Sequence, residues 1–349
     1  MKKSTLLLFS VLLFIFSCDS DFDVNADWKE SMVVYGLLDQ SVDTQKVIIY
    51  KAFLGNQSAY ALAQEIDSIY YGENDLEVFL YGLDGEDTIQ TIALNYTETN
   101  NRNHSGSDTI FSLEKSVEYT TTEKLDPELV YHFYALNLNS GNEVRSSTSL
   151  ISPLDINEGF GDVIFFKNNQ YRTYKLKWRS SANAISYKPI LRFYYIEKDV
   201  FTGEVSYKFI EKEYAEQSSV NANGGQQMEL GISGESFYYF VKNSISPNEN
   251  VERINAQELD DGVSSSDNWL GGIEFRFVVG GEEISQYISI NNLPNLLFQD
   301  PPTYTNIENG LGIFSSRLNA SLSYKKLEVQ SLSELSSGET TNELGFIVP

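Results

Sequence analysis

The sequence has very few of the side chains on which most catalytic and metal sites depend. It contains one cysteine, Cys18, and two histidines, His104 and His132, among 349 residues. A single cysteine excludes an internal disulfide and a zinc site built from several thiolates. The chain also lacks a Gly-x-Ser-x-Gly elbow, a His-Glu-x-x-His motif, a P-loop and a dinucleotide-binding fingerprint. We therefore predict no catalytic residues, no metal site, no cofactor and no enzymatic activity.

Positive charge is also scarce. The chain has 25 Lys and Arg residues against 49 Asp and Glu residues, which gives a net charge of −24. Such an acidic chain is repelled by phosphate backbones, which argues against a nucleic-acid partner. The acidity does not indicate disorder, because 13% of the residues are aromatic and disordered chains are poor in aromatic side chains. The length predicts about two folded domains of roughly 150 residues each.

A hydrophobic run long enough to span a bilayer is missing from the N-terminus. The run from Leu6 to Phe16 follows two lysines, and it is shorter than the about 20 apolar residues that a membrane span needs. Residues 1–17 therefore fit a signal peptide. The segment that ends this run, Ile15-Phe16-Ser17-Cys18, resembles a bacterial lipobox, which implies that Cys18 carries lipid and anchors the protein to a membrane. An ordinary secretory signal is the alternative.

Acidic residues follow Cys18 directly. Asp19, Ser20, Asp21 and Asp23 resemble the export signal of Bacteroidota lipoproteins, which implies a location on the outer face of the outer membrane. We expect residues 18–28 to form a lipidated acidic tether. A purely solvated spacer is one alternative. A calcium loop is another, although the glycine turn and closing glutamate of an EF-hand are absent.

The rest of the chain has the pattern of a β protein. Short runs of β-branched and aromatic residues recur between Gly, Asn and Asp, and no helical apolar period extends over four turns. This pattern predicts an all-β fold of two β-sandwich-like domains with few short helices. We expect an immunoglobulin- or fibronectin-III-like domain over 29–152 and a mostly antiparallel β-rich domain over 153–349. A Ser/Thr-rich linker over 147–154 would join them at Pro153.

Individual strands follow from the same pattern. The expected strands are 32–38, 46–50, 76–81, 88–94, 130–136, 174–178, 187–196, 205–210, 273–279 and 284–290. The last two would form a hairpin through Gly280-Gly281, and Asp84-Gly85 would form another tight turn. Trp178 alternates with Leu176 and Tyr174, so we expect it to face a core. Periodicity leaves 236–245 open as a strand or as a helix capped by Ser233 or Ser236.

A second local motif lies before the strand 130–136. Leu125, Pro127 and Tyr131 have the spacing Leu-x-Pro-x-x-x-Tyr, which resembles the tyrosine corner of immunoglobulin-like sandwiches. In that motif the tyrosine hydroxyl bonds to backbone a few residues upstream. The resemblance implies a structural role for Tyr131. We therefore expect the neighbouring His132 to be a surface or core residue and not a catalytic one. His104 lies in a polar loop.

A family resemblance comes from residues 304–314. Asn306, Asn309, Gly310, Gly312 and Phe314 form an Asn-Ile-x-Asn-Gly-x-Gly-x-Phe motif. With the early strand 33–38, it resembles the Bacteroidota lipoprotein family called domain of unknown function 4249. The resemblance implies an envelope lipoprotein often encoded beside TonB-dependent outer-membrane transporters, and it implies no activity. From the residue types we expect the glycines to allow close backbone approach and the asparagines to hold the loop.

These expectations lead to one main function and two alternatives. We predict a surface-exposed, non-catalytic accessory of a TonB-dependent barrel, with an oligosaccharide or peptide as ligand. An adhesin or structural envelope module is the first alternative. A glycan hydrolase that uses two carboxylates is the second. Separately, Glu258, Asp260 and Asp261 form the densest acidic loop cluster of the second half, which could bind calcium, although we expect exposed loop acids there. The tyrosines considered for carbohydrate contact, with core packing expected for each, are Tyr194, Tyr195, Tyr238 and Tyr239.

Overall fold

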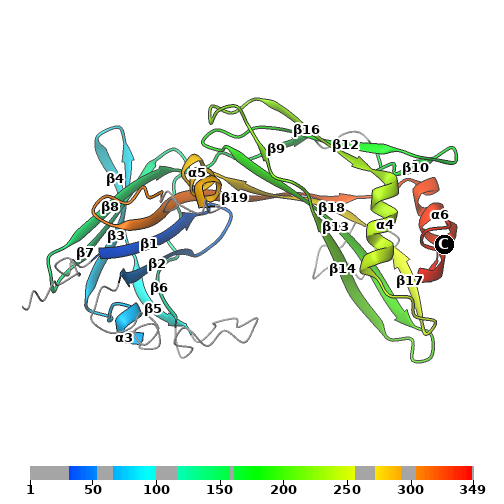
Figure 1. Cartoon of the computed structure of the whole chain (residues 1–349), viewed down its shortest axis with the longest axis horizontal. Coiled ribbons are helices and arrows are strands. Elements are labelled where there is room, and N and C mark those ends of the chain that lie inside the picture. The colour runs from blue at the N-terminus through cyan, green and yellow to red at the C-terminus, as the bar shows by residue number, and fades with distance from the viewer. Residues whose placement is uncertain are drawn as a thin grey trace, which may run out of the picture.

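The structure is a computed structural model that describes residues 31–52, 66–99, 116–157, 161–255, 272–291 and 304–347. Over these ranges the fold is all-β, with few short helices and two lobes joined side by side (Figure 1). The following predicted residues lie outside the described ranges: Cys18, Asp19, Ser20, Asp21, Asp23, His104, Glu258, Asp260 and Asp261. The predictions for them remain predictions.

The first lobe packs two sheets face to face around one core. One sheet has the strand order β4-β3-β7-β8, and the other continues in the order β1-β2-β6-β5. Alternation along the strands directs one face inward: Tyr131, Phe133 and Ala135 of β7 are buried, whereas His132 is exposed. The elements are β1 (Ser31–Leu38), β2 (Gln45–Ala52), α3 (Ile66–Ile69), β3 (Leu76–Asp84), β4 (Asp87–Ala93), β5 (Asn95–Thr99), β6 (Ser116–Thr121), β7 (Val130–Asn137) and β8 (Glu143–Ser149).

The second lobe is built around the long strand β13. Trp178 of β12 is buried, as expected, and its ring centroid lies 5.0 Å from that of Phe277 in β18. Helices α4 and α6 contribute buried residues to the same core. The elements are β9 (Asp155–Asn157), β10 (Phe166–Lys167), β11 (Gln170–Tyr171), β12 (Thr173–Arg179), β13 (Ser186–Asp199), β14 (Val205–Glu213), β15 (Gln217–Ser218), β16 (Gln227–Ser233), α4 (Gly234–Ser244), β17 (Val251–Asn255), β18 (Ile273–Gly280), α6 (Val329–Ser337), η2 (Asn342–Leu344) and β20 (Phe346–Ile347).

One strand, β19 (Leu311–Lys325), belongs to both lobes. Its first six residues pair in parallel with β1, and its remainder pairs antiparallel with β18. The two lobes therefore share one continuous 11-stranded sheet. The prediction that all of 153–349 forms the second domain is wrong for 304–316. Ile307 and Phe314 pack in the core of the first lobe, because sequence order alone does not reveal this return of the chain.

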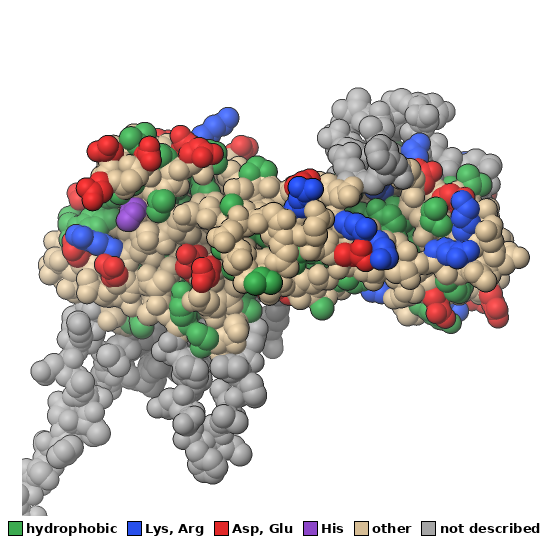
Figure 2. Space-filling view, turned by 90° about the horizontal axis from the view of Figure 1, so that it is seen from above, with side chains coloured by type: hydrophobic (Ala, Val, Ile, Leu, Met, Phe, Trp, Pro, Cys, Tyr) green, Lys and Arg blue, Asp and Glu red, His purple; other side chains and the backbone are tan. Residues whose placement is uncertain are grey.

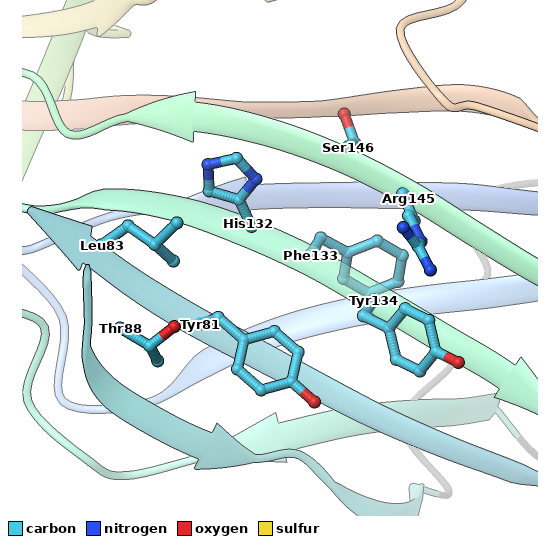
Figure 3. A pocket seen from close by; sticks show the side chains of 8 residues that line it. All are labelled: Tyr81, Leu83, Thr88, His132, Phe133, Tyr134, Arg145 and Ser146. Carbon is cyan, nitrogen blue, oxygen red and sulfur yellow. The ribbon is translucent and has the colours of Figure 1, made fainter. Parts of the chain in front are cut away.

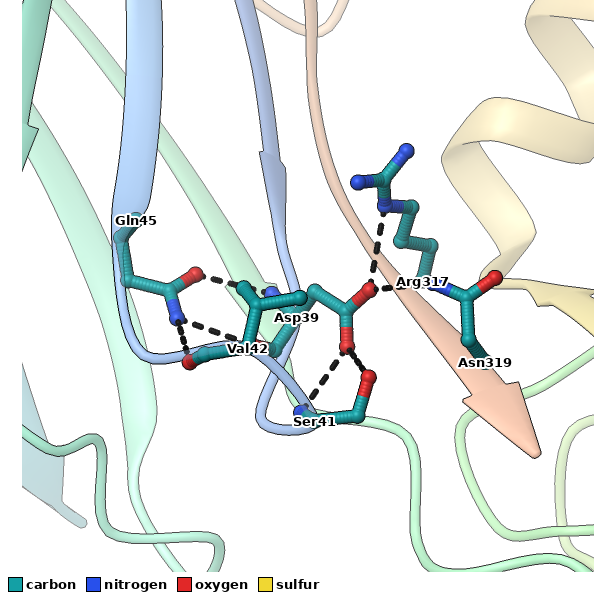
Figure 4. Close-up of polar contacts among 6 residues, drawn as sticks. All are labelled: Asp39, Ser41, Val42, Gln45, Arg317 and Asn319. Carbon is teal, nitrogen blue, oxygen red and sulfur yellow. Dashed lines mark hydrogen bonds and ion pairs between the residues drawn. The ribbon is translucent and has the colours of Figure 1, made fainter. Parts of the chain in front are cut away.

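The junction between the lobes is held by a buried carboxylate at the end of β1. Asp39 is 1% exposed, and its Oδ2 accepts hydrogen bonds from Asn319 Nδ2 at 2.8 Å and from Arg317 Nε at 3.2 Å (Figure 4). The backbone N–H of Ser41 donates to the other carboxylate oxygen at 2.9 Å. Asp39 thus ties the end of β1 to the middle of β19, where that strand passes from one lobe to the other.

The predicted Ser/Thr linker is ordered structure instead. Residues up to Ser149 belong to β8, where Ser146 and Thr148 are buried. Leu150 and Ile151 are also buried, and the N–H of Ser152 donates to the carbonyl of Ala182 at 3.1 Å. The composition suggested a loop, but small polar residues also fit an alternating strand, and only the pairing with β7 decides between the two.

The predicted strand over 284–290 is wrong, because these residues form helix α5 (Glu282–Asn291). Ile284, Tyr287 and Ile288 can lie on one face of a helix, so the apolar residues of this segment fit a helix as well as a strand. Two acids in the first turn favour a helix start, and the Ile284 N–H donates to Ser315 Oγ of β19. The open segment 236–245 is also helical, as α4. Its N-cap is Ser233, whose side chain accepts from the N–H of Ser236.

Candidate functional site

The segment 304–314 forms a closed loop that packs against the core of the first lobe. The side-chain amide of Asn306 donates to the carbonyl of Phe314 at 2.6 Å and accepts from its N–H at 2.9 Å. The ring of Phe314 is buried, with its centroid 5.2 Å from that of Phe133. Asn306 thus closes the loop onto its own end, as its residue type suggested.

The two glycines of this segment allow close backbone approach. A Cβ on Gly310 would lie 2.8 Å from the carbonyl oxygen of Met32, and one on Gly312 would lie 2.1 Å from that of Val34. Asn309, which directly precedes Gly310, has a positive φ of 59°. Gly310 and Gly312 therefore let β19 lie directly beside β1, which gives the motif a packing role.

The tyrosine corner holds the turn before β7. The hydroxyl of Tyr131 is buried, accepts from the backbone N–H of Asp126 at 2.6 Å and donates to Gln90 Oε1 at 2.7 Å. Leu125 packs partly buried against the core, and Pro127 is exposed. This is the upstream backbone contact that the motif predicts, and it fixes which residues of β7 point outward.

The outward face of the same sheet carries a group of half-buried aromatic rings, which we name the aromatic platform: Phe79, Tyr81 and Tyr134. Phe79 and Tyr81 alternate along β3, and their rings stack at 5.8 Å with an angle of 23°. Tyr134 lies opposite Phe79 on β7, with its centroid 6.4 Å from that of Tyr81. Figure 3 shows the rings of Tyr81 and Tyr134 side by side.

An arginine and a glutamate from β8 hold one end of the aromatic platform. Arg145 lies over the ring of Tyr134, with its guanidinium carbon 5.5 Å from the centroid, and pairs with Glu143 at 2.9 Å. The Tyr134 hydroxyl donates to Glu143 at 2.9 Å. Burial and this bond to a carboxylate raise the pKa of Tyr134, so the hydroxyl remains a donor at neutral pH. These contacts restrain the ring before any ligand arrives.

A shallow hollow of about 450 Å³ lies over this face. The side chains that border it from the outer face are Tyr81, Leu83, Thr88, His132, Tyr134 and Arg145. The exposed His132 lies opposite Tyr81, so the hollow has hydrogen-bonding groups on both sides of the rings. Figure 2, a view from above, shows acidic, basic and hydrophobic side chains mixed over the surface of this lobe, with a histidine among them.

Sequence reasoning did not identify the aromatic platform. Of the four tyrosines considered, Tyr195 and Tyr238 are buried in the second core, and Tyr194 donates to Glu274 at 2.6 Å. Tyr239 is 51% exposed on α4. The missed signal lies in β3, where apolar residues occupy both faces, although those on one face, Phe79, Tyr81 and Leu83, are only partly buried. An antiparallel strand with one solvated face normally alternates apolar and polar residues.

The hollow is bordered by aromatic, hydroxyl, imidazole and guanidinium groups. None of the residues that line the hollow is an Asp or a Glu, and both oxygens of the nearby Glu143 are engaged by Tyr134 and Arg145. Across the described ranges, no group of three His, Cys, Asp or Glu side chains is placed to hold a metal ion. No helix within those ranges is long and apolar enough to cross a membrane.

No protein-family model matches the chain, and no curated protein matches it. The resemblance of residues 304–314 to a lipoprotein family therefore stays a prediction that rests on those residues.

Proposed function

We propose that this protein is a lipid-anchored accessory protein on the outer face of the outer membrane, where it captures an oligosaccharide without cleaving it. The observation that carries the proposal is the aromatic platform of Phe79, Tyr81 and Tyr134 on the solvent face of β3 and β7. The membrane location is supported by Cys18 and the acidic residues after it. A TonB-dependent barrel is the proposed recipient, on the family resemblance alone.

Sugar chemistry matches this site better than a purely apolar ligand does. A pyranose ring has a face of C–H groups that packs against an aromatic ring, and it has hydroxyls around its rim. The aromatic platform offers ring faces, while Arg145, His132 and Thr88 lie at its border. Mostly apolar walls with a few placed polar groups are typical of small-molecule sites. A peptide ligand is the competing outcome of the binding test.

The test of the site is direct binding by the full-length protein in detergent. On an array of bacterial and plant oligosaccharides, followed by calorimetry, Tyr81→Ala should weaken binding about tenfold or more, because a stacking face is lost. Tyr239→Ala removes an exposed tyrosine from the other lobe and should leave the affinity unchanged. Absence of any bound glycan, or equal effects of the two variants, would contradict the proposal. Binding of peptides alone would change the ligand class.

The test of the partner is a pull-down from detergent-solubilised outer membranes. Recovery of a TonB-dependent barrel supports the accessory function, and its absence favours an adhesin or structural module. Cys18→Ala should release the protein from membranes. Replacement of Asp19, Asp21 and Asp23 by Ala should leave it lipidated but protected from protease added to intact cells. Turnover on a polysaccharide panel that disappears when one acid is replaced by Ala would favour the hydrolase.

A further inference from the structure

The outer face of the β4-β3-β7-β8 sheet places its side chains in rows that cross the strands. Arg145 of β8 lies opposite Tyr134 of β7, which in turn lies opposite Phe79 of β3. The next row toward the β3–β4 turn consists of Tyr81, His132 and Ser147. The hollow over this face therefore has aromatic rings at its centre and a guanidinium at its β8 side.

The ion pair of Arg145 and Glu143 has a direction relative to this hollow. Among the described residues that border the hollow, Arg145 is the only lysine or arginine, and no Asp or Glu is present. Glu143 lies one row further from the hollow, opposite Leu136. Arg145 thus lies between Glu143 and the hollow, so the positive end of the pair faces the space that a ligand would occupy.

The guanidinium of Arg145 is held in place and still has donors to offer. Its Nη2 contacts Glu143 at 2.9 Å, and its central carbon lies 5.5 Å from the ring centroid of Tyr134. A guanidinium carries five N–H donors in a rigid, planar fork, and in the described part of the chain Glu143 is its only ion-pair partner. The Arg145 side chain is 56% exposed, so the remaining donors are open to a ligand.

The surroundings of the hollow restrict where an anionic group can lie. The chain carries a net charge of −24, and the turn at the far end of β3 presents three exposed acids, Asp84, Glu86 and Asp87. The field of such exposed charges is screened over about 8–10 Å at physiological salt. An anion in direct contact with Arg145 is attracted at a hydrogen-bond distance of about 3 Å, whereas an anion placed at the turn is repelled.

We infer that the hollow binds an acidic oligosaccharide, whose ring carboxylate pairs with Arg145. The inference rests on the proposed function and names the class of sugar. In a uronic acid the carboxylate projects from the edge of the ring, so the C–H face lies on Tyr81 while the carboxylate reaches the guanidinium. Arginine binds a carboxylate through two parallel N–H···O bonds, which fixes the orientation of the sugar. The acidic end of the ligand lies toward β8 and away from the β3–β4 turn.

The test uses the full-length protein in detergent and oligosaccharides of galacturonic, glucuronic and mannuronic acid, each paired with its methyl ester. Esterification removes the charge and keeps the sugar ring. Calorimetry should show binding of at least one acid, with its ester weaker by about tenfold or more, because a charge-assisted hydrogen bond is lost. Equal binding of acid and ester, or binding of neutral glycans but of no acid, would overturn the inference and leave the proposed sugar site intact. Absence of any glycan binding would overturn both.

Variants of the protein then test whether Arg145 makes the distinction. Arg145→Gln should bind the acid and its ester with equal affinity, because the charge is lost, whereas a merely structural role would weaken both ligands alike and keep the preference. Arg145→Lys keeps the charge but loses the fork, so it should retain part of the preference.

Arg179→Gln is the matched control for these variants. Arg179 lies on β12 of the other lobe, its side chain is 60% exposed, and it pairs with Asp155 at 3.7 Å. This variant should keep the full preference for the acid, and unfolding midpoints confirm that each variant folds. A preference that survives Arg145→Gln, or that disappears in Arg179→Gln, would overturn the assignment to Arg145.

Discussion

A Cβ added to Gly312 of β19 would lie 2.1 Å from the carbonyl oxygen of Val34 in β1. Gly312 also has a φ of +99°, which side-chain-bearing residues rarely adopt. This contact occurs where β19 enters the sheet of the first lobe in parallel with β1. The shared strand that unites the two lobes therefore depends on glycine at this position.

Gly312→Ala should destabilise the protein strongly. The new methyl group meets backbone that has no room to move, and the φ adds strain, so we expect a loss of about 3–5 kcal/mol in the free energy of unfolding. Gly85→Ala is the matched control, because Gly85 has a φ of +61° but open space around it, and it should cost about 1–2 kcal/mol. Urea unfolding measures both. Similar losses in the two variants would show that the close approach to Val34 has no effect.

Tyr131→Phe should lower the free energy of unfolding by about 0.5–1.5 kcal/mol. The ring would stay in the core, but the Asp126 N–H and the Gln90 amide oxygen would lose their common partner. Tyr239→Phe, with its side chain half exposed on α4, should have almost no effect. An unchanged denaturation midpoint for Tyr131→Phe would argue against the structural role of the corner.

Asp39→Ala should cost more than Arg317→Ala. Removal of the carboxylate leaves the Asn319 amide, the Ser41 N–H and the Arg317 guanidinium without their acceptor, and we expect a loss of about 2 kcal/mol. Arg317 has a side chain that is 45% exposed, so its loss should cost below about 1 kcal/mol. Denaturant midpoints of the two variants give the order. The reverse order would mean that the ion pair, and not the buried amide bonds, holds the junction.

Stability should fall in acid because of Glu197. Burial would raise the pKa of this carboxyl, but hydrogen bonds from Lys208 and the buried Arg253 outweigh burial and hold the pKa below its usual value near 4.5. A lowered pKa stabilises the folded protein above the unfolded pKa, and this contribution is lost as pH falls through the folded value. The stability difference between the wild type and Glu197→Gln should therefore shrink below pH 4.5. A difference independent of pH would rule out this linkage.

Limited proteolysis should spare the crossing between the lobes. Leu150 and Ile151 are buried, and the Leu150 carbonyl accepts from Asn183 Nδ2 at 2.9 Å. Thermolysin should therefore cut the exposed turn at Phe201 before any bond between residues 146 and 157. Mass spectrometry of the first fragments identifies the sites. Early cleavage at Ile151 would instead support the flexible linker that the Ser/Thr composition predicts.

The sequence by itself determined the class of fold and many of its strands. Alternating apolar residues report on which side of a strand meets a core, and this local rule correctly placed Trp178 inside the second lobe. The spacing of Leu125, Pro127 and Tyr131 likewise predicted a contact within a few residues of the chain. Such features depend on neighbours in sequence, so one chain is enough to infer them.

Only the tertiary structure decided the features that depend on distant residues. Residues 284–290 suit a strand and a helix equally, and their packing on β19 selects the helix. Strand β19 returns to pair with β1, and Tyr81 of β3 lies beside Tyr134 of β7. The residue pattern of one segment does not indicate which distant segment it will contact. The physical reason is that the spacing of apolar residues shows only whether one face of a strand or helix is apolar. Which surface covers that face, or leaves it open to a ligand, is set by the pairing and packing of the whole chain.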